Sequence, residues 1–166
     1  MYKADLGEIG TAEINGGSML KIYLDNCCYH RPFDDLSEDK IEKEATAKLF
    51  IQSLVKYRSI SLCYSFISLS EIEASPFEVS KAHIIGFIEK NATTLISYKH
   101  LDELKALTAE IIQKGIKQKD ATHLACAIFA KCDYFITTDK RLLNFYTDKI
   151  KIMNPIDFVN FWRDTV

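Results

Sequence analysis

The chain has 166 residues, of which 48% are hydrophobic and 27% are charged, and its formal net charge is −2. This composition is typical of a globular protein and argues against extended disorder, and the net charge carries no general signal of nucleic-acid binding. No apolar run approaches the roughly 20 residues that a membrane helix needs. The N-terminus also lacks a signal-peptide pattern, and five cysteines without a Cys-x-x-Cys pair fit a reduced, cytoplasmic protein.

Residues 1–18 differ in character from the rest of the chain. They are polar and rich in glycine, and they show no sustained helical or strand periodicity. We interpret them as a flexible extension or an artificial leader. Residues 19–166 are long enough to form one domain with a sizeable core, and we expect a single domain there.

The first half of this domain predicts two strands, each followed by a helix. Four residues with apolar bodies precede Asp25, which predicts a short buried strand with a carboxylate at its end: Leu20, Ile22, Tyr23 and Leu24. Helical spacing then continues from about residue 39 to residue 57. Residues 59–67 alternate as a second strand, and a serine-capped short helix follows that carries Glu71 and ends before Pro76.

The second half continues the alternation of helices and strands. A helix opens at Asp120, and a strand over residues 134–137 leads through two threonines to Asp139. We expect helices over residues 77–90, 101–114 and 155–163, and strands over residues 93–98 and 149–153. Strands that alternate with helices predict an α/β fold, with a mostly parallel central sheet that is covered by helices on both faces.

Four acids occupy strand ends or helix starts in this pattern. In a parallel α/β sheet these positions lie on one rim, so Asp25, Glu71, Asp120 and Asp139 are expected to converge. Four neighbouring carboxylates repel one another unless cations neutralise them. Mg²⁺ or Mn²⁺ prefers such oxygen ligands, and pairs of these ions can activate a water and stabilise the leaving oxygen of a phosphodiester.

Other titratable residues near these motifs have simpler interpretations. Glu73 points to a different helix face from Glu71 and is expected to be solvated, and Asp133 precedes a strand at its opposite end. His123 follows Asp120 by one turn and either faces the site or packs in the core. Cys126, three residues after His123, would need further ligands to hold zinc, so we interpret it as a core residue.

Taken together, four short motifs resemble the PIN-domain ribonucleases, the family that includes VapC-type toxins. The motifs are LDNCC, SLSEI, KDATHLACA and FITTDKRL, and the similarity extends over residues 19 to about 164. The resemblance implies a three-layer α/β/α sandwich and a Mg²⁺- or Mn²⁺-dependent endoribonuclease. It assigns the metal-binding and catalytic roles to the four acids, with Asn26 and Thr138 supporting them.

The chain departs from the common family pattern in two places. Cys27 stands where the family commonly has Ser or Asn, and the segment YHRPFDDLSEDK lengthens the region after the first acid. These departures resemble a less studied bacterial branch of the family. The resemblance further implies an RNA substrate, an antitoxin protein as partner and a homodimer, which would make the chain the toxin of a toxin–antitoxin pair.

An RNA substrate also requires positive charge beside the acids. Five basic residues lie next to the motifs and are candidates for contacts with RNA phosphates: Arg31, Lys117, Lys119, Lys140 and Arg141. A receiver domain or a haloacid-dehalogenase-type phosphatase would need a second acid beside or two residues after Asp25, and the sequence lacks it. The remaining alternative is a non-catalytic PIN-fold module that binds or scaffolds.

Overall fold

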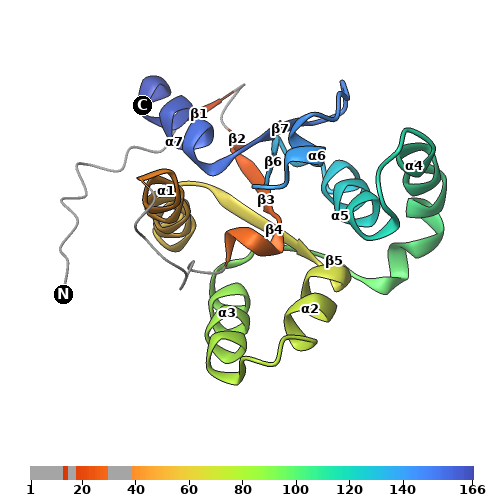
Figure 1. The fold of residues 1–166 in the computed structure, drawn as a ribbon, viewed down its shortest axis with the longest axis horizontal. Coiled ribbons are helices and arrows are strands. Elements are labelled where there is room, and N and C mark those ends of the chain that lie inside the picture. Colours follow the sequence, from red (N-terminus) through yellow and green to blue (C-terminus); the bar gives the residue numbers. More distant parts are fainter. Residues whose placement is uncertain (1–12, 15–17, 30–38) are drawn as a thin grey trace.

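The structure is a computed structural model that describes residues 13–14, 18–29 and 39–166. Its centre is a five-stranded sheet in which neighbouring strands are parallel (Figure 1). The chain enters at the middle strand, builds one side of the sheet, and then returns to build the other side. In spatial order the strands are β5 (Thr94–Ile96), β4 (Ser61–Ser65), β3 (Lys21–Leu24), β6 (Tyr134–Ile136) and β7 (Lys151–Met153).

Helices cover both faces of this sheet and produce three layers, which confirms the predicted α/β/α sandwich. One face packs against α1 (Asp39–Lys56), α3 (Glu78–Asn91) and α7 (Pro155–Thr165). The other packs against α4 (Leu101–Gln113) and α5 (Gln118–Phe129). The shorter elements are α2 (Phe66–Glu73), α6 (Lys140–Leu143) and the 3₁₀ turns η1 (Asn26–Cys28) and η2 (Tyr98–His100).

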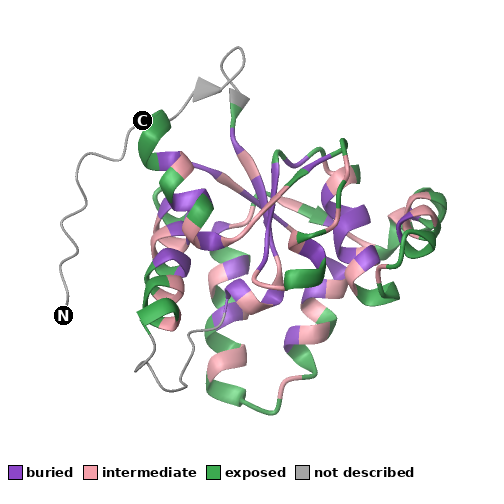
Figure 2. Ribbon diagram, turned by 45° about the horizontal axis from the view of Figure 1, so that its top comes forward, coloured by how far each residue is buried: buried purple, intermediate pink, exposed green. Residues whose placement is uncertain are grey.

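Side chains of the central strands alternate between the two helical layers. Ile22 and Leu24 of β3 belong to the core beneath α1 and α7, whereas Tyr23 between them belongs to the core beneath α5. In the neighbouring strand β6, Phe135 belongs to the same core as Tyr23 and stacks on its ring at a centroid distance of 5.4 Å. Both faces are therefore apolar, and buried residues run through the middle of the molecule (Figure 2).

The second strand is shorter than the alternation of residues 59–67 predicts. It ends at Ser65, because the Ser65 hydroxyl accepts a hydrogen bond from the Ser68 N–H and caps α2. Helix α2 therefore begins at Phe66. As a consequence, Glu71 lies in the second turn of α2 rather than near its start.

The extension expected over residues 1–18 lies mostly outside the described residues. Its described part contains β1 (Glu13–Ile14), which pairs in antiparallel fashion with β2 (Ser18–Met19). In the part of the chain that the structure describes, the helices fall short of the length and apolar character required to cross a membrane.

The stacked pair Tyr23 and Phe135 predicts a stability effect. Phe135 is fully buried, so Phe135→Ala should lower the free energy of unfolding by about 3–5 kcal/mol through lost burial and a new cavity. Urea titration followed by circular dichroism measures this change. Tyr146→Ala, which removes a ring that is 84% exposed, should shift stability by no more than about 0.5 kcal/mol. Equal effects of the two substitutions would contradict the described core.

Candidate functional site

The four predicted acids occupy the rim at the carboxyl ends of the central strands. Asp25 follows β3 and Asp139 follows β6, and these neighbouring strands flank the point where the chain order reverses across the sheet. Open parallel sheets bind ligands at such a switch point. Asp120 lies in the first turn of α5, and Glu71 projects from α2.

Thr137 joins the first and last of these acids. Its hydroxyl donates a hydrogen bond to Asp25 Oδ2 at 2.7 Å and accepts one from the Asp139 N–H at 3.0 Å. Asp25 Oδ1 accepts from the Asn26 N–H at 2.8 Å, so both oxygens of Asp25 have a hydrogen-bond donor. Asp139 caps α6 by accepting from the Arg141 N–H at 2.8 Å. Thr137 therefore fixes the carboxylate of Asp25 beside Asp139.

Glu71 is held from two sides. Asn26 Nδ2 donates to its Oε2 at 2.5 Å, and His123 Nε2 lies 3.0 Å from its Oε1. The Lys119 ammonium lies 3.8 Å from the same Oε1. Partial burial favours a higher pKa for Glu71, but the interaction with His123, the charge of Lys119 and the Asn26 hydrogen bond outweigh it and lower the pKa. Glu71 therefore remains ionised.

The pKa of Asp120 depends on the charges of the other three acids. Its pKa is raised from the ordinary value, first by partial burial and then by the negative charges of Asp25 and Asp139, with a smaller contribution from Glu71. The interaction with His123 partly opposes this increase. Asp120 thus lies close enough to Asp25, Asp139 and Glu71 for their charges to act on its carboxylate.

A buried polar network lies behind Glu71, and sequence reasoning did not identify it. Tyr23 is fully buried, and its hydroxyl lies 2.6 Å from His123 Nδ1, while the other ring nitrogen of His123 faces Glu71. Burial raises the pKa of Tyr23 well above its ordinary value, so the phenol keeps its proton. The only sequence signal was the placement of His123 one helical turn after Asp120.

The adjacent thiols of Cys27 and Cys28 lie at the same rim. Their sulfur atoms are 3.8 Å apart, and Cys27 Sγ lies 4.0 Å from the Thr137 hydroxyl. The hydrogen bond with Cys28 lowers the pKa of Cys27 to about 7, with help from Thr138 and against the effects of burial and of Asp25. Thr138 therefore interacts with Cys27, whereas the hydroxyl that contacts Asp25 belongs to Thr137. All five cysteines are free thiols.

The donor types at this rim suit a hard divalent cation. Carboxylate oxygens are the ligands that Mg²⁺ and Mn²⁺ prefer, and the repulsion felt by Asp120 would decrease on binding a cation. Asn26 Oδ1 is buried without a hydrogen-bond partner among the described residues, so it is a further free oxygen acceptor. Within residues 13–14, 18–29 and 39–166, however, no three His, Cys, Asp or Glu side chains are arranged as the ligands of one metal ion.

The candidate RNA-contacting residues surround the acids unevenly. Lys117 and Lys119 lie at the start of α5, and Lys140 and Arg141 begin α6, and all four are exposed. Arg31 lies outside the described residues. Two acids that we set aside are also exposed: Glu73, and Asp133, which accepts a hydrogen bond from the N–H of Lys21 at the opposite end of β3.

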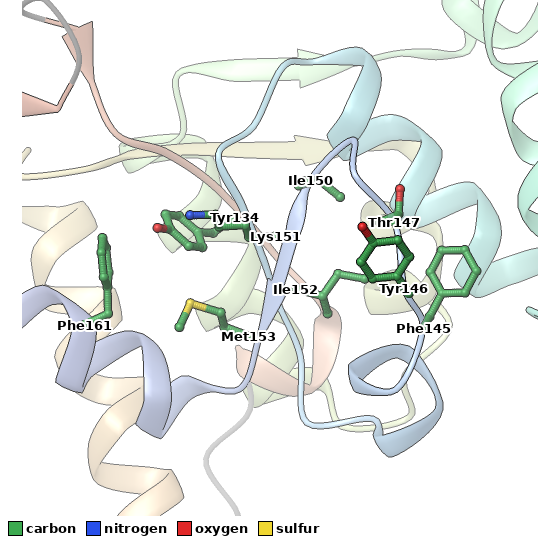
Figure 3. A pocket seen from close by; sticks show the side chains of 9 residues that line it. All are labelled: Tyr134, Phe145, Tyr146, Thr147, Ile150, Lys151, Ile152, Met153 and Phe161. Carbon is green, nitrogen blue, oxygen red and sulfur yellow. The ribbon is translucent and has the colours of Figure 1, made fainter.

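A separate hollow of about 390 Å³ lies along the outer strand β7 (Figure 3). Mostly apolar side chains, among them those of Tyr134, Met153 and Phe161, line it. The lining includes no carboxylate. The acidic rim, rather than this hollow, is therefore the candidate functional site.

Comparisons with known proteins relate the fold to one class of structure. The chain matches no known protein-family model and no curated protein. It does resemble a chain in the crystal structure of VapBC2 from Rickettsia felis bound to a DNA fragment from their promoter, with a TM-score of 0.52 and 17% sequence identity. The match covers 81% of this chain and 98% of that chain. The shared feature is the fold, and the five-stranded parallel sheet flanked by helices is consistent with a PIN-like fold.

The two hydrogen bonds of Thr137 predict the effect of removing its hydroxyl. Thr137→Val should lower the free energy of unfolding by about 1–3 kcal/mol, because a carboxylate and a backbone N–H lose their partner. Chemical denaturation measures the change. Thr138→Val is the matched control and should have the smaller effect; a larger effect of the control would contradict the role of Thr137.

The raised pKa of Asp120 predicts a gain in stability on neutralisation. An acid whose pKa is higher in the folded state binds more protons when folded, so it destabilises the protein above the folded pKa and ceases to do so as the pH falls below the unfolded pKa. Without divalent cations, Asp120→Asn should therefore increase the free energy of unfolding at neutral pH, and the difference from wild type should shrink on acidification.

Urea titrations at neutral and mildly acidic pH test this dependence. Asp102→Asn is the matched control, because Asp102 also lies in the first turn of a helix but is almost fully exposed. A loss of stability in Asp120→Asn at neutral pH would contradict the mutual repulsion of the acids.

Proposed function

We propose that this chain is a metal-dependent endoribonuclease that hydrolyses RNA phosphodiester bonds at the acidic rim. The proposal is supported most strongly by the placement of Asp25, Glu71, Asp120 and Asp139 at one rim of the sheet. Carboxylates gathered at one place repel one another and reduce stability, so such clusters often serve a function. The fold similarity to a chain of VapBC2 agrees with this class of enzyme.

In this proposal the four acids hold Mg²⁺ or Mn²⁺. When bound, such ions neutralise phosphate charge and lower the pKa of water so that it can attack phosphorus. Thr137 and the Asn26 N–H contribute by fixing both oxygens of Asp25, and His123 and Asn26 fix those of Glu71. These contacts orient Asp25 and Glu71 individually. Since no three acids of the described residues are arranged as ligands of one ion, cation binding would draw the carboxylates closer together.

The surrounding lysines give the rim a cationic border. Lys117, Lys119 and Lys140 are exposed near the helix starts that carry Asp120 and Asp139, where they can neutralise RNA phosphates. Their contacts are with the backbone and so carry no base specificity. The proposed substrate class is therefore RNA, with no sequence preference assigned.

The proposal extends to partners and to cell compartment. The similar chain comes from VapBC2, a structure that also contains a promoter DNA fragment. By analogy we propose an antitoxin protein as the partner of this chain, a homodimer as its assembly, a toxin–antitoxin pair as its context and the cytoplasm as its location.

RNA cleavage by the purified full chain tests the activity. With Mn²⁺ or Mg²⁺ the protein should cut a mixed single-stranded RNA, and EDTA should abolish cutting. Asp25→Asn should reduce the rate by more than about 100-fold, because even changes to residues behind metal ligands cost about 10–100-fold.

Three outcomes separate the alternatives. Cutting that persists in both EDTA and Asp25→Asn would point to a contaminating nuclease and contradict the proposal. No cutting and no Mn²⁺ binding by a folded protein would favour the non-catalytic binding or scaffolding module. Mn²⁺ binding without cutting would keep the metal site but contradict single-stranded RNA as a sufficient substrate.

A further inference from the structure

Four buried side chains form a continuous hydrogen-bond network that ends at Glu71. The Tyr23 hydroxyl lies 2.7 Å from Ser65 Oγ, 2.9 Å from Ser68 Oγ and 2.6 Å from His123 Nδ1. His123 Nε2 then lies 3.0 Å from Glu71 Oε1. Tyr23, Ser65 and Ser68 are fully buried and His123 is 1% exposed, so water does not substitute for these contacts.

Counting donors and acceptors gives this network a direction. An ionised Glu71 only accepts, so His123 Nε2 must carry a proton. In a neutral imidazole Nδ1 is then an acceptor, and the Tyr23 hydroxyl donates to it. A phenol oxygen has one proton and accepts two hydrogen bonds, and the hydroxyls of Ser65 and Ser68 supply them. Every member of the network is satisfied.

The network also joins the elements that carry three of the four acids. Tyr23 lies in β3, two residues before Asp25, and His123 lies in α5, one turn after Asp120. Ser68 and Glu71 lie on α2. A buried polar group reduces stability unless it makes hydrogen bonds, and an apolar residue could fill the same space. A purely structural role therefore does not explain why the network ends on a rim carboxylate.

We propose that His123 and Tyr23 are positioning residues: the Nε2–H of His123, whose ring is held by Tyr23, orients the Glu71 carboxylate toward the acidic rim. The orientation itself is independent of any activity. Its consequence for cation binding rests on the proposed function.

Nuclear magnetic resonance of the ¹⁵N-labelled full chain tests the orientation directly. In a neutral His123 ring the single proton should lie on Nε2. Tyr23→Phe should move the Nδ1 resonance, because that nitrogen loses its donor, and should leave the proton on Nε2. A proton on Nδ1 in the wild type, or an Nδ1 resonance that ignores Tyr23→Phe, would overturn the proposal.

Calorimetric Mn²⁺ titration tests the consequence. His123→Ala should weaken Mn²⁺ affinity by about 10–100-fold, and His123→Gln should recover part of it, because the glutamine amide can donate to Glu71. His100→Gln is the matched control, since His100 contacts the backbone oxygen of Ser97 and should leave affinity unchanged. Circular dichroism checks that each variant is folded.

The two measurements fail in different ways. Wild-type protein that binds no Mn²⁺ would contradict the proposed function, while the resonance measurement would still decide the orientation of His123. Wild-type binding that His123→Ala and His123→Gln both leave unchanged would contradict the positioning role and leave the proposed function standing. If His123→Ala fails to fold, His123→Gln and Tyr23→Phe still test the positioning role.

Discussion

Electrostatic repulsion among carboxylates at one rim of the sheet is the constraint on which the rest of this site depends. The topology brings Asp25 and Asp139 to adjacent strand ends, and the helix starts bring Asp120 beside them. Burial and these neighbouring charges raise the pKa of Asp120. Such a site weakens the folded state unless a cation or protein donors offset the charge.

The protein offsets this charge unequally. Glu71 receives a hydrogen bond from Asn26, a contact with His123 and the charge of Lys119, and its pKa falls. Asp25 receives hydrogen bonds from Thr137 and Asn26 that orient it without adding a positive side chain. The pKa of Asp120 instead rises through partial burial and the negative charges of Asp25 and Asp139, a repulsion that a bound cation would relieve.

Much of the fold was predictable because its pattern is local. Ile22, Tyr23 and Leu24 are all apolar because β3 is covered on both faces, and α5 shows a helical spacing of small apolar residues. The positions of Asp25 and Asp139 follow from the same pattern, because polar residues are expected where a buried parallel strand leaves the core. The end of the second strand at Ser65 was not predictable, because the sequence continues to alternate beyond it while the Ser65 hydroxyl already caps α2.

The contacts that support the acids depend on long-range geometry. Thr137 and Thr138 are adjacent threonines that the sequence alone does not distinguish. The hydroxyl that contacts Asp25 belongs to Thr137, the first residue after the end of β6 at Ile136. Tyr23 and His123 are 100 residues apart, so their contact depends on how α5 lies on β3. Sequence patterns identify a buried tyrosine and a helical histidine, but not that they meet.

Calorimetric titration of the full chain with Mn²⁺, in the wild type and in Asp25→Asn, tests the central claim most directly. If the converging carboxylates form a cation site, the wild type binds Mn²⁺ saturably and the folded Asp25→Asn variant loses that binding. Equal binding by both proteins, or none by the folded wild type, would contradict the account.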